Sequence, residues 1–165
     1  MKFAVAELKY ISMLVPFLST REYRALSAML HRRQPDFCEI IGHVAMDPRC
    51  ISAHEFCIRF CMIAFKYAEE HARSRLPRYS RYEFEEVARA IARGEEAKIG
   101  KRACGFRNRI ARHVLSHYDF DNDDTEWLCT TISAFLFITE SSMRREKRRQ
   151  TSQPGAGSRR KKPRG

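Results

Sequence analysis

Apolar residues recur every three or four positions along most of the chain, which is the period of an α-helix with one buried face. The first such run, residues 5–15, stops at Pro16, which cannot continue a helix. Ser19, followed three residues later by Glu22, has the spacing of a capping box and predicts a second helix that runs towards Arg33. The chain is therefore expected to begin with two short helices.

The middle of the chain predicts one long buried helix. A short apolar segment, residues 37–46, precedes it between two proline-containing breaks. Ser52 and Glu55 have the spacing of a second capping box, which starts the longest periodic run, roughly residues 53–75. Because this run is apolar nearly all round as far as Ala68, we expect it to be the central helix of the fold.

Two further helices are predicted in the second half of the chain. Ser80 with Glu83 forms a third capping box for a helix over residues 81–93, and Gly94 is its expected C-cap. The side chains expected to face inward from this helix are Tyr82, Val87 and Ile91. A helix with a less sharply marked start is expected over residues 106–118.

The last predicted helix follows an acidic loop, residues 119–124. Asp123 with Glu126 is its expected cap, and its apolar positions mark a core helix that continues into a basic region near Arg149. Nowhere is the alternation of apolar and polar residues that marks a β-strand sustained. The sequence therefore predicts an all-α fold, a compact bundle of five to seven helices in residues 1–140.

The charge is concentrated at the C-terminal end. The 165-residue chain has 31 Lys and Arg against 20 Asp and Glu, a formal net charge of +11, and one acidic residue stands among the basic ones in residues 141–165. The basic side chains there are Arg144, Arg145, Lys147, Arg148, Arg149, Arg159, Arg160, Lys161, Lys162 and Arg164. Residues 151–165 have no apolar side chain larger than alanine, so we expect a basic extension that ends in a disordered tail.

Such a cluster predicts contact with a polyanion. Its arginine bias favours bidentate contact with phosphate, so nucleic acid is the expected partner, RNA ahead of DNA. The clusters at 144–149 and 159–164, separated by a short spacer, also resemble a bipartite nuclear import signal, which makes an import receptor the alternative partner. A tail that merely keeps the protein soluble is the remaining interpretation.

Neither a membrane nor a cofactor is expected. The apolar start, residues 3–15, is broken by Glu7 and Lys9 and lacks the layout of a signal peptide, and no apolar run reaches about 20 residues. The sequence has no glycine-rich phosphate loop and no nucleophile elbow. We therefore expect an intracellular protein, nuclear in a eukaryotic or viral source and otherwise cytoplasmic, with a homodimer as an option.

Six cysteines raise the question of disulfides or a metal. Most lie in helical patterns, so free buried thiols are expected rather than a disulfide framework. Four candidate ligands share one helical face: Cys50, His54, Cys57 and Cys61. The first and last would be about 16 Å apart along the helix, too far for one zinc ion. Because the acidic loop also lacks the glycine and glutamate of a calcium loop, no metal is expected.

One segment carries a candidate catalytic pair. Arg112 and His117 are separated by four residues, His113 directly follows the arginine, and Tyr118 directly follows the histidine. This arrangement resembles the motif region of HEPN-type domains, small all-α ribonucleases, and Arg107 with His113 gives a second match. The resemblance implies a metal-independent endoribonuclease, in which the arginine holds a phosphate while the histidine exchanges a proton with the ribose hydroxyl.

The charge pattern favours a small regulatory or virus-like nucleic-acid-binding protein, rather than an enzyme, whose Arg- and Lys-rich C-terminus serves binding, nuclear targeting or both. The HEPN-like ribonuclease is the enzyme alternative. A third class is a protein-interaction adaptor whose helical body binds another protein and whose tail only directs localisation.

Overall fold

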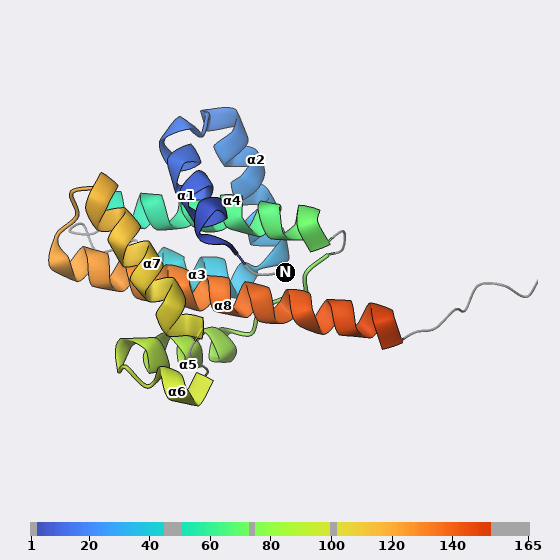
Figure 1. The fold of residues 1–165 in the computed structure, drawn as a ribbon. Helices are drawn as coiled ribbons and strands as arrows, with labels where there is room; N and C mark the ends of the chain where they lie inside the picture. The colour runs from blue at the N-terminus through green and yellow to red at the C-terminus, as the bar shows by residue number, and fades with distance from the viewer. Residues whose placement is uncertain (1–2, 45–50, 73–74, 100–101, 153–165) are drawn as a thin grey trace, which may run out of the picture.

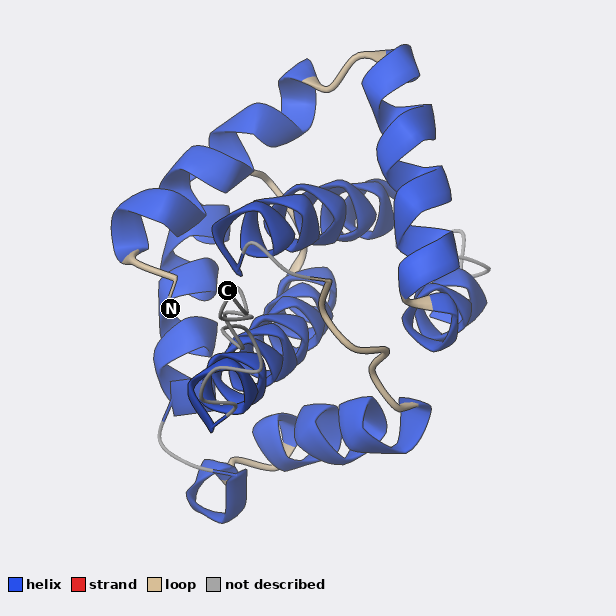
Figure 2. Cartoon of the chain, turned by 90° about the vertical axis from the view of Figure 1, so that its right-hand side faces the viewer, coloured by secondary structure: helices blue, strands red, loops and turns tan. Residues whose placement is uncertain are grey.

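A computed structural model describes residues 3–44, 51–72, 75–99 and 102–152. Within these ranges every regular element is a helix and no strand occurs (Figures 1 and 2). Seven of the helices have ten or more residues, which confirms the expected all-α bundle. The elements are α1 (Val5–Leu14), the 3-10 helix η1 (Val15–Phe17), α2 (Thr20–Arg33), α3 (Pro35–Val44), α4 (Ile51–Ala72), α5 (Arg81–Ala92), α6 (Glu96–Ile99), α7 (Arg102–His117) and α8 (Asn122–Ser152).

Helix α8 crosses the middle of the molecule (Figure 1). It packs against α4, α5 and α7, while α1, η1 and α2 pack against α4. Much of α4 is buried as far as Ala68, as expected, but α8 shares the central position with it. None of the described helices is both long enough and apolar enough to cross a membrane.

Helix α8 is buried although its sequence is only partly apolar. The buried hydroxyls of Thr125, Thr130 and Ser133 have no hydrogen-bond partner among the described residues, whereas that of Thr139 is satisfied. Most side chains in its middle part are buried, and those of Ser133 and Thr139 are fully so. Thr139 Oγ1 donates to the carbonyl of Phe135 (2.7 Å) and accepts from the hydroxyl of Tyr79 (2.9 Å). A hydroxyl that bonds to its own helix in this way can enter a core at little cost.

The inward face of α5 corrects one expectation. Val87 and Ile91 are buried as predicted, but Tyr82 is 73% exposed, so its predicted inward position is wrong. Phe84 is buried instead because it lies three residues before Val87 and therefore on the same helical face, whereas Tyr82 lies about 140° round the helix from Val87. The Phe84 ring meets that of Phe37 from α3, with 5.2 Å between the ring centroids.

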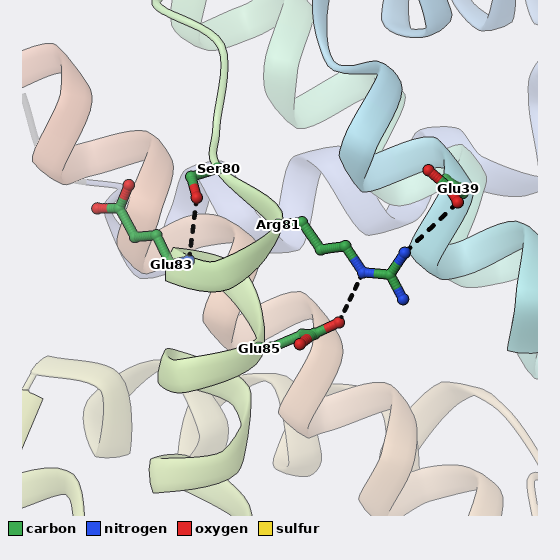
Figure 3. A network of polar contacts seen from close by, with 5 residues as sticks. All are labelled: Glu39, Ser80, Arg81, Glu83 and Glu85. Carbon is green, nitrogen blue, oxygen red and sulfur yellow. Dashed lines mark hydrogen bonds and ion pairs between the residues drawn. The ribbon is translucent and has the colours of Figure 1, made fainter.

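Three of the predicted helix ends are found in the structure. Ser19 caps α2, and it forms the reciprocal capping box with Glu22. Ser80 caps α5 by accepting from the backbone N–H of Glu83, although the Glu83 carboxylate does not close the second half of the box (Figure 3). Gly94 follows α5 with φ +68°, a backbone conformation that glycine adopts without strain.

Two predicted caps are wrong. The cap of α8 is Asp121, whose Oδ1 accepts from the backbone N–H of Asp124 at 2.7 Å, and Asp123 lies inside the first turn. Helix α4 begins one residue before Ser52, so Ser52 is inside the helix and cannot cap it. Helix α8 also reaches Ser152, and the rest of the expected disordered tail lies outside the described residues.

Candidate nucleic-acid interface

The C-terminal part of α8 continues beyond the packed body. Met143 is the last residue of α8 whose described side chain is buried, yet the helix runs on to Ser152, and Figure 1 shows this end projecting from the bundle. We call residues 144–152 the helical extension. Its exposed basic side chains are Arg145, Lys147, Arg148 and Arg149. The three arginines share one helical face by their spacing, and the lysine lies on the other side.

Carboxylates hold the base of the helical extension. Arg144 pairs with Glu140 (3.3 Å) and Arg145 with Glu83 of α5 (3.1 Å). Glu140 is 1% exposed and also accepts the backbone N–H of Phe3 (2.6 Å). Two of the predicted binding residues therefore also anchor the extension to the body. The remaining predicted residues, Arg159, Arg160, Lys161, Lys162 and Arg164, lie outside the described residues.

A pocket of about 530 Å³ between α1 and α7 contains part of the predicted catalytic motif. Its basic lining consists of Lys9, Arg109 and Arg112, and His113 lies beside them. Among the described residues that line it there is no carboxylate. The Nε of Arg109 is buried without a hydrogen-bond partner in the described part of the chain, and its guanidinium lies 4.8 Å from the ring centroid of Phe106. The pocket thus concentrates positive charge.

The two members of the predicted catalytic pair cannot both be placed. Arg112 is exposed at the rim of this pocket, and its Nε donates to the carbonyl of Asn108 (3.3 Å). The side chain of His117 lies outside the described ones. His113 is the histidine that lines the pocket, and its Nε2 is hydrogen-bonded to Ser12 Oγ of α1. A ribonuclease with Arg112 and His117 stays a prediction.

The second match of the motif is divided by the fold. Arg107 donates to the carbonyl of Ile91 (3.1 Å) and to the carboxylate of Glu126 (2.7 Å), so it ties α7 to α5 and α8 and does not line the pocket. Tyr118 packs edge-on against Phe56 of α4, with 4.5 Å between the ring centroids. Both residues thus have structural partners.

The cysteines behave as the sequence predicts where they are described. Those four are free thiols: Cys38, Cys57, Cys61 and Cys129. Burial raises the pKa of Cys38 and that of Cys129 to about 11, and it raises the pKa of Cys61 well above the usual range. These thiols therefore stay protonated and unreactive at neutral pH.

Three of the four candidate metal ligands, His54, Cys57 and Cys61, lie on the described helix α4. Cys50 lies outside the described residues, and the Nε2 of His54 is hydrogen-bonded to the carbonyl of Ile41 (2.8 Å). No group of three or more metal-ligating side chains is found in the part of the chain that the structure describes.

A second basic surface was not predicted from the sequence. A groove of about 450 Å³ lies between the C-terminal end of α2 and the segment 75–80 that follows α4. We call it the arginine groove after the residues that line it: Arg32, Arg33, Arg75 and Arg78. The sequence shows two arginine pairs, but they are far apart along the chain, and only the fold brings them together.

No relative of the chain emerges from comparison. Protein-family models, curated proteins and solved structures give no match in any of the three cases. The geometry and charge of the described residues are therefore what bears on function.

Proposed function

We propose that the protein binds nucleic acid through the phosphate backbone, RNA ahead of DNA, with the basic C-terminal residues as its main contact. The observation that carries the proposal is the helical extension of α8, which continues past Met143 with exposed Lys147, Arg148 and Arg149. Arginine on a projecting helix can make bidentate contact with phosphate oxygens. Nuclear import through the same residues stays a second use of the cluster.

The shape of the helical extension favours a single strand. Only two turns of helix project, and basic side chains lie on more than one side of them. A flexible single strand can bend round such a short helix, whereas a duplex is stiff over many base pairs. Single-stranded segments are also the usual targets of RNA-binding proteins, which places RNA ahead of DNA.

The test of this proposal removes charge from the helical extension in the full-length chain. We expect Lys147→Ala/Arg148→Ala/Arg149→Ala to weaken binding of a 20-nucleotide single-stranded RNA on the order of 10- to 100-fold at 0.1 M salt. Each lost phosphate contact reduces the log–log salt slope by about 0.7, so three contacts reduce it by about 2. Fluorescence anisotropy titrations at several salt concentrations, repeated with duplex DNA, measure both quantities.

The matched control removes the same charge elsewhere. Arg21 and Arg24 on α2 and Lys98 on α6 are exposed and lie far along the chain from the helical extension. The triple alanine variant at these positions should keep the affinity within about threefold. Equal losses in the two triple variants would show that only net charge matters and would contradict the assignment to α8.

The ribonuclease is the second candidate, favoured by Lys9, Arg109 and Arg112 around the α1–α7 pocket. Arg112 would hold the scissile phosphate and His117 would exchange the proton. We expect metal-free wild-type protein to cleave single-stranded RNA, and Arg112→Ala or His117→Ala to abolish cleavage, as followed on a denaturing gel. Absence of wild-type cleavage, or cleavage retained in both variants, would falsify this candidate; Arg24→Ala, at an exposed position of α2, is the matched control.

The adaptor hypothesis would use the outer side of α1 and η1. Large apolar side chains are exposed there: Val5, Tyr10, Met13 and Phe17. Exposed apolar surface of this kind marks interaction sites, but it does not identify a partner. The charge of the helical extension does identify one by its chemistry, so nucleic-acid binding is the function that the described surface supports best.

A further inference from the structure

The arginine groove is the second concentration of positive charge on the body. Its polar walls are Arg32 and Arg33 at the end of α2, and Arg75 and Arg78 in the segment 75–80. Met29 and Leu76 complete its lining. In Figure 1 the segment 75–80 and the helical extension lie on the same side of the molecule, the side that Figure 2 turns towards the viewer.

A buried glutamine holds the two walls of the groove together. Gln34, 1% exposed, directly follows α2, and its Nε2 donates to the carbonyl of Pro77 (2.9 Å). Its Oε1 accepts the backbone N–H of Tyr79 (2.7 Å). Tyr79 is itself buried, so the segment that carries Arg75 and Arg78 is fixed against the end of α2.

The far end of the same segment is also fixed. Ser80 caps α5, and Arg81 pairs with Glu85 of α5 (2.8 Å) and with Glu39 of α3 (3.4 Å), as Figure 3 shows. Arg81 is thereby committed to two carboxylates and does not line the groove. The backbone that carries Arg75 and Arg78 is therefore held in place by contacts that do not use their guanidinium groups.

The positive charge of the groove is only partly balanced. Arg33 lies 3.7 Å from Glu69, whose other oxygen accepts the backbone N–H of Leu76. Arg75 and Arg78 have no hydrogen-bond or ion-pair partner among the described residues. Guanidinium groups that converge on one groove repel one another, and an anion between them relieves that repulsion.

Helix ends explain only half of this cluster. Arg32 and Arg33 lie in the last turn of α2, where a positive charge is favourable because of the helix dipole, and Arg32 Nε donates to the carbonyl of Ala28. Arg75 and Arg78 lie outside the helices, so that effect does not account for them. Their position opposite the end of α2 leaves two exposed guanidinium groups free to contact an anion.

We infer that the arginine groove binds phosphate groups of the nucleic acid backbone and is a second contact for the same strand as the helical extension. This inference rests on the proposed function. Each wall of the groove carries two guanidinium groups, which can make bidentate contact with phosphate. The groove and the helical extension lie on the same side of the molecule, so one strand can reach both. The body thus contributes binding that the C-terminal cluster alone does not supply.

The test substitutes the two unpartnered arginines in the full-length chain. Arg75→Ala/Arg78→Ala should weaken binding of the 20-nucleotide RNA on the order of 10-fold at 0.1 M salt and reduce the salt slope by about 1.4, as two lost phosphate contacts require. Arg21→Ala/Arg24→Ala is the matched control with the same change of charge and should stay within about twofold. Arg75→Lys/Arg78→Lys keeps the charge but loses the bidentate fork, so its affinity should fall between those of the wild type and the alanine variant. Thermal unfolding of each variant confirms that it is folded.

The outcomes separate the groove from the helical extension. Loss in the groove variant but not in its control supports the inference. No loss in the groove variant, with loss in the Lys147/Arg148/Arg149 variant, overturns the groove and leaves the proposed function standing. Loss in the groove variant alone supports the groove and removes the extension. In a further outcome, the wild-type protein fails to bind RNA but binds vesicles of phosphatidylserine and phosphatidylcholine, and that binding is lost in Arg75→Ala/Arg78→Ala. In that case the ligand of the groove is a lipid headgroup, and the inference is overturned.

Discussion

At the scale of single residues, Gln34 links the end of α2 to the segment 75–80. Its side-chain amide satisfies two backbone groups of the segment 75–80, the carbonyl of Pro77 and the N–H of Tyr79. A buried backbone group that loses its partner costs about 1–3 kcal/mol, because water cannot replace the lost bond. The stability of the fold and the shape of the arginine groove therefore depend on one glutamine.

We expect Gln34→Met to lower the free energy of unfolding by about 2–3 kcal/mol. Methionine fills a similar volume without polar atoms, so the loss reports the two hydrogen bonds rather than a cavity. Urea unfolding followed by circular dichroism measures the change. Arg32→Ala, at an exposed position in the last turn of α2, is the control and should change the free energy of unfolding by less than about 0.5 kcal/mol. Wild-type stability in Gln34→Met would mean that these hydrogen bonds contribute nothing net.

The sequence predicts where Gln34 breaks the chain but not what it does there. The run Gln-Pro-Asp marks the end of one helix, and α2 does end at Arg33 with α3 starting at Pro35. The partners of Gln34 are more than forty residues away along the chain. Such a contact has no local signature, and for the same reason the arginine groove was not predicted.

At the scale of helices, the predictions that succeed are those decided within one turn. Ser19 with Glu22 is a reciprocal box whose two hydrogen bonds lie within four residues, and the structure has it. In the acidic loop, both Asp121 and Asp123 carry a side chain of the type that caps helices, and it is Asp121 that accepts the backbone N–H of Asp124 at the start of α8. The sequence identifies residues that are able to cap a helix, and the folded structure shows which of them does so.

Helix α8 shows the same division between local and global information. Its apolar positions predict a core helix, and the structure also buries polar residues such as Ser133 and Thr139 in it. These side chains are enclosed by α4, α5 and α7. The hydroxyl of Thr139 bonds to a carbonyl one turn earlier, whereas that of Ser133 is buried without a hydrogen-bond partner among the described residues. The central position of α8 follows from those neighbours.

At the scale of the whole molecule, the net charge does not show where the basic side chains lie on the folded surface. Residues before 141 are close to neutral in sum, so the sequence marks the C-terminal cluster as the basic region. The fold separates the charges of the body: it pairs Arg81 and Arg107 with carboxylates and brings the groove arginines together. A sum over the sequence cannot show this, because it does not depend on where the charges lie.

The folded body extends beyond Glu140, into the part of α8 that contains Met143. A boundary after Glu140 would cut α8 before the buried Met143 and would remove both arginines that anchor the helical extension. Burial of one methionine side chain contributes about 1.5–3 kcal/mol, and the ion pair of Arg144 with the buried Glu140 would be lost as well. We therefore expect residues 1–140 to be roughly 2–4 kcal/mol less stable to urea than the full chain, and residues 1–145 to be within about 1 kcal/mol of it.

Residues 1–145 keep the arginine groove but lose most of the basic cluster, so the same preparation should bind single-stranded RNA more weakly than the full chain and with a smaller salt slope. Full stability of residues 1–140 would place the end of the core before Met143, and undiminished RNA affinity of residues 1–145 would move the whole interface to the body.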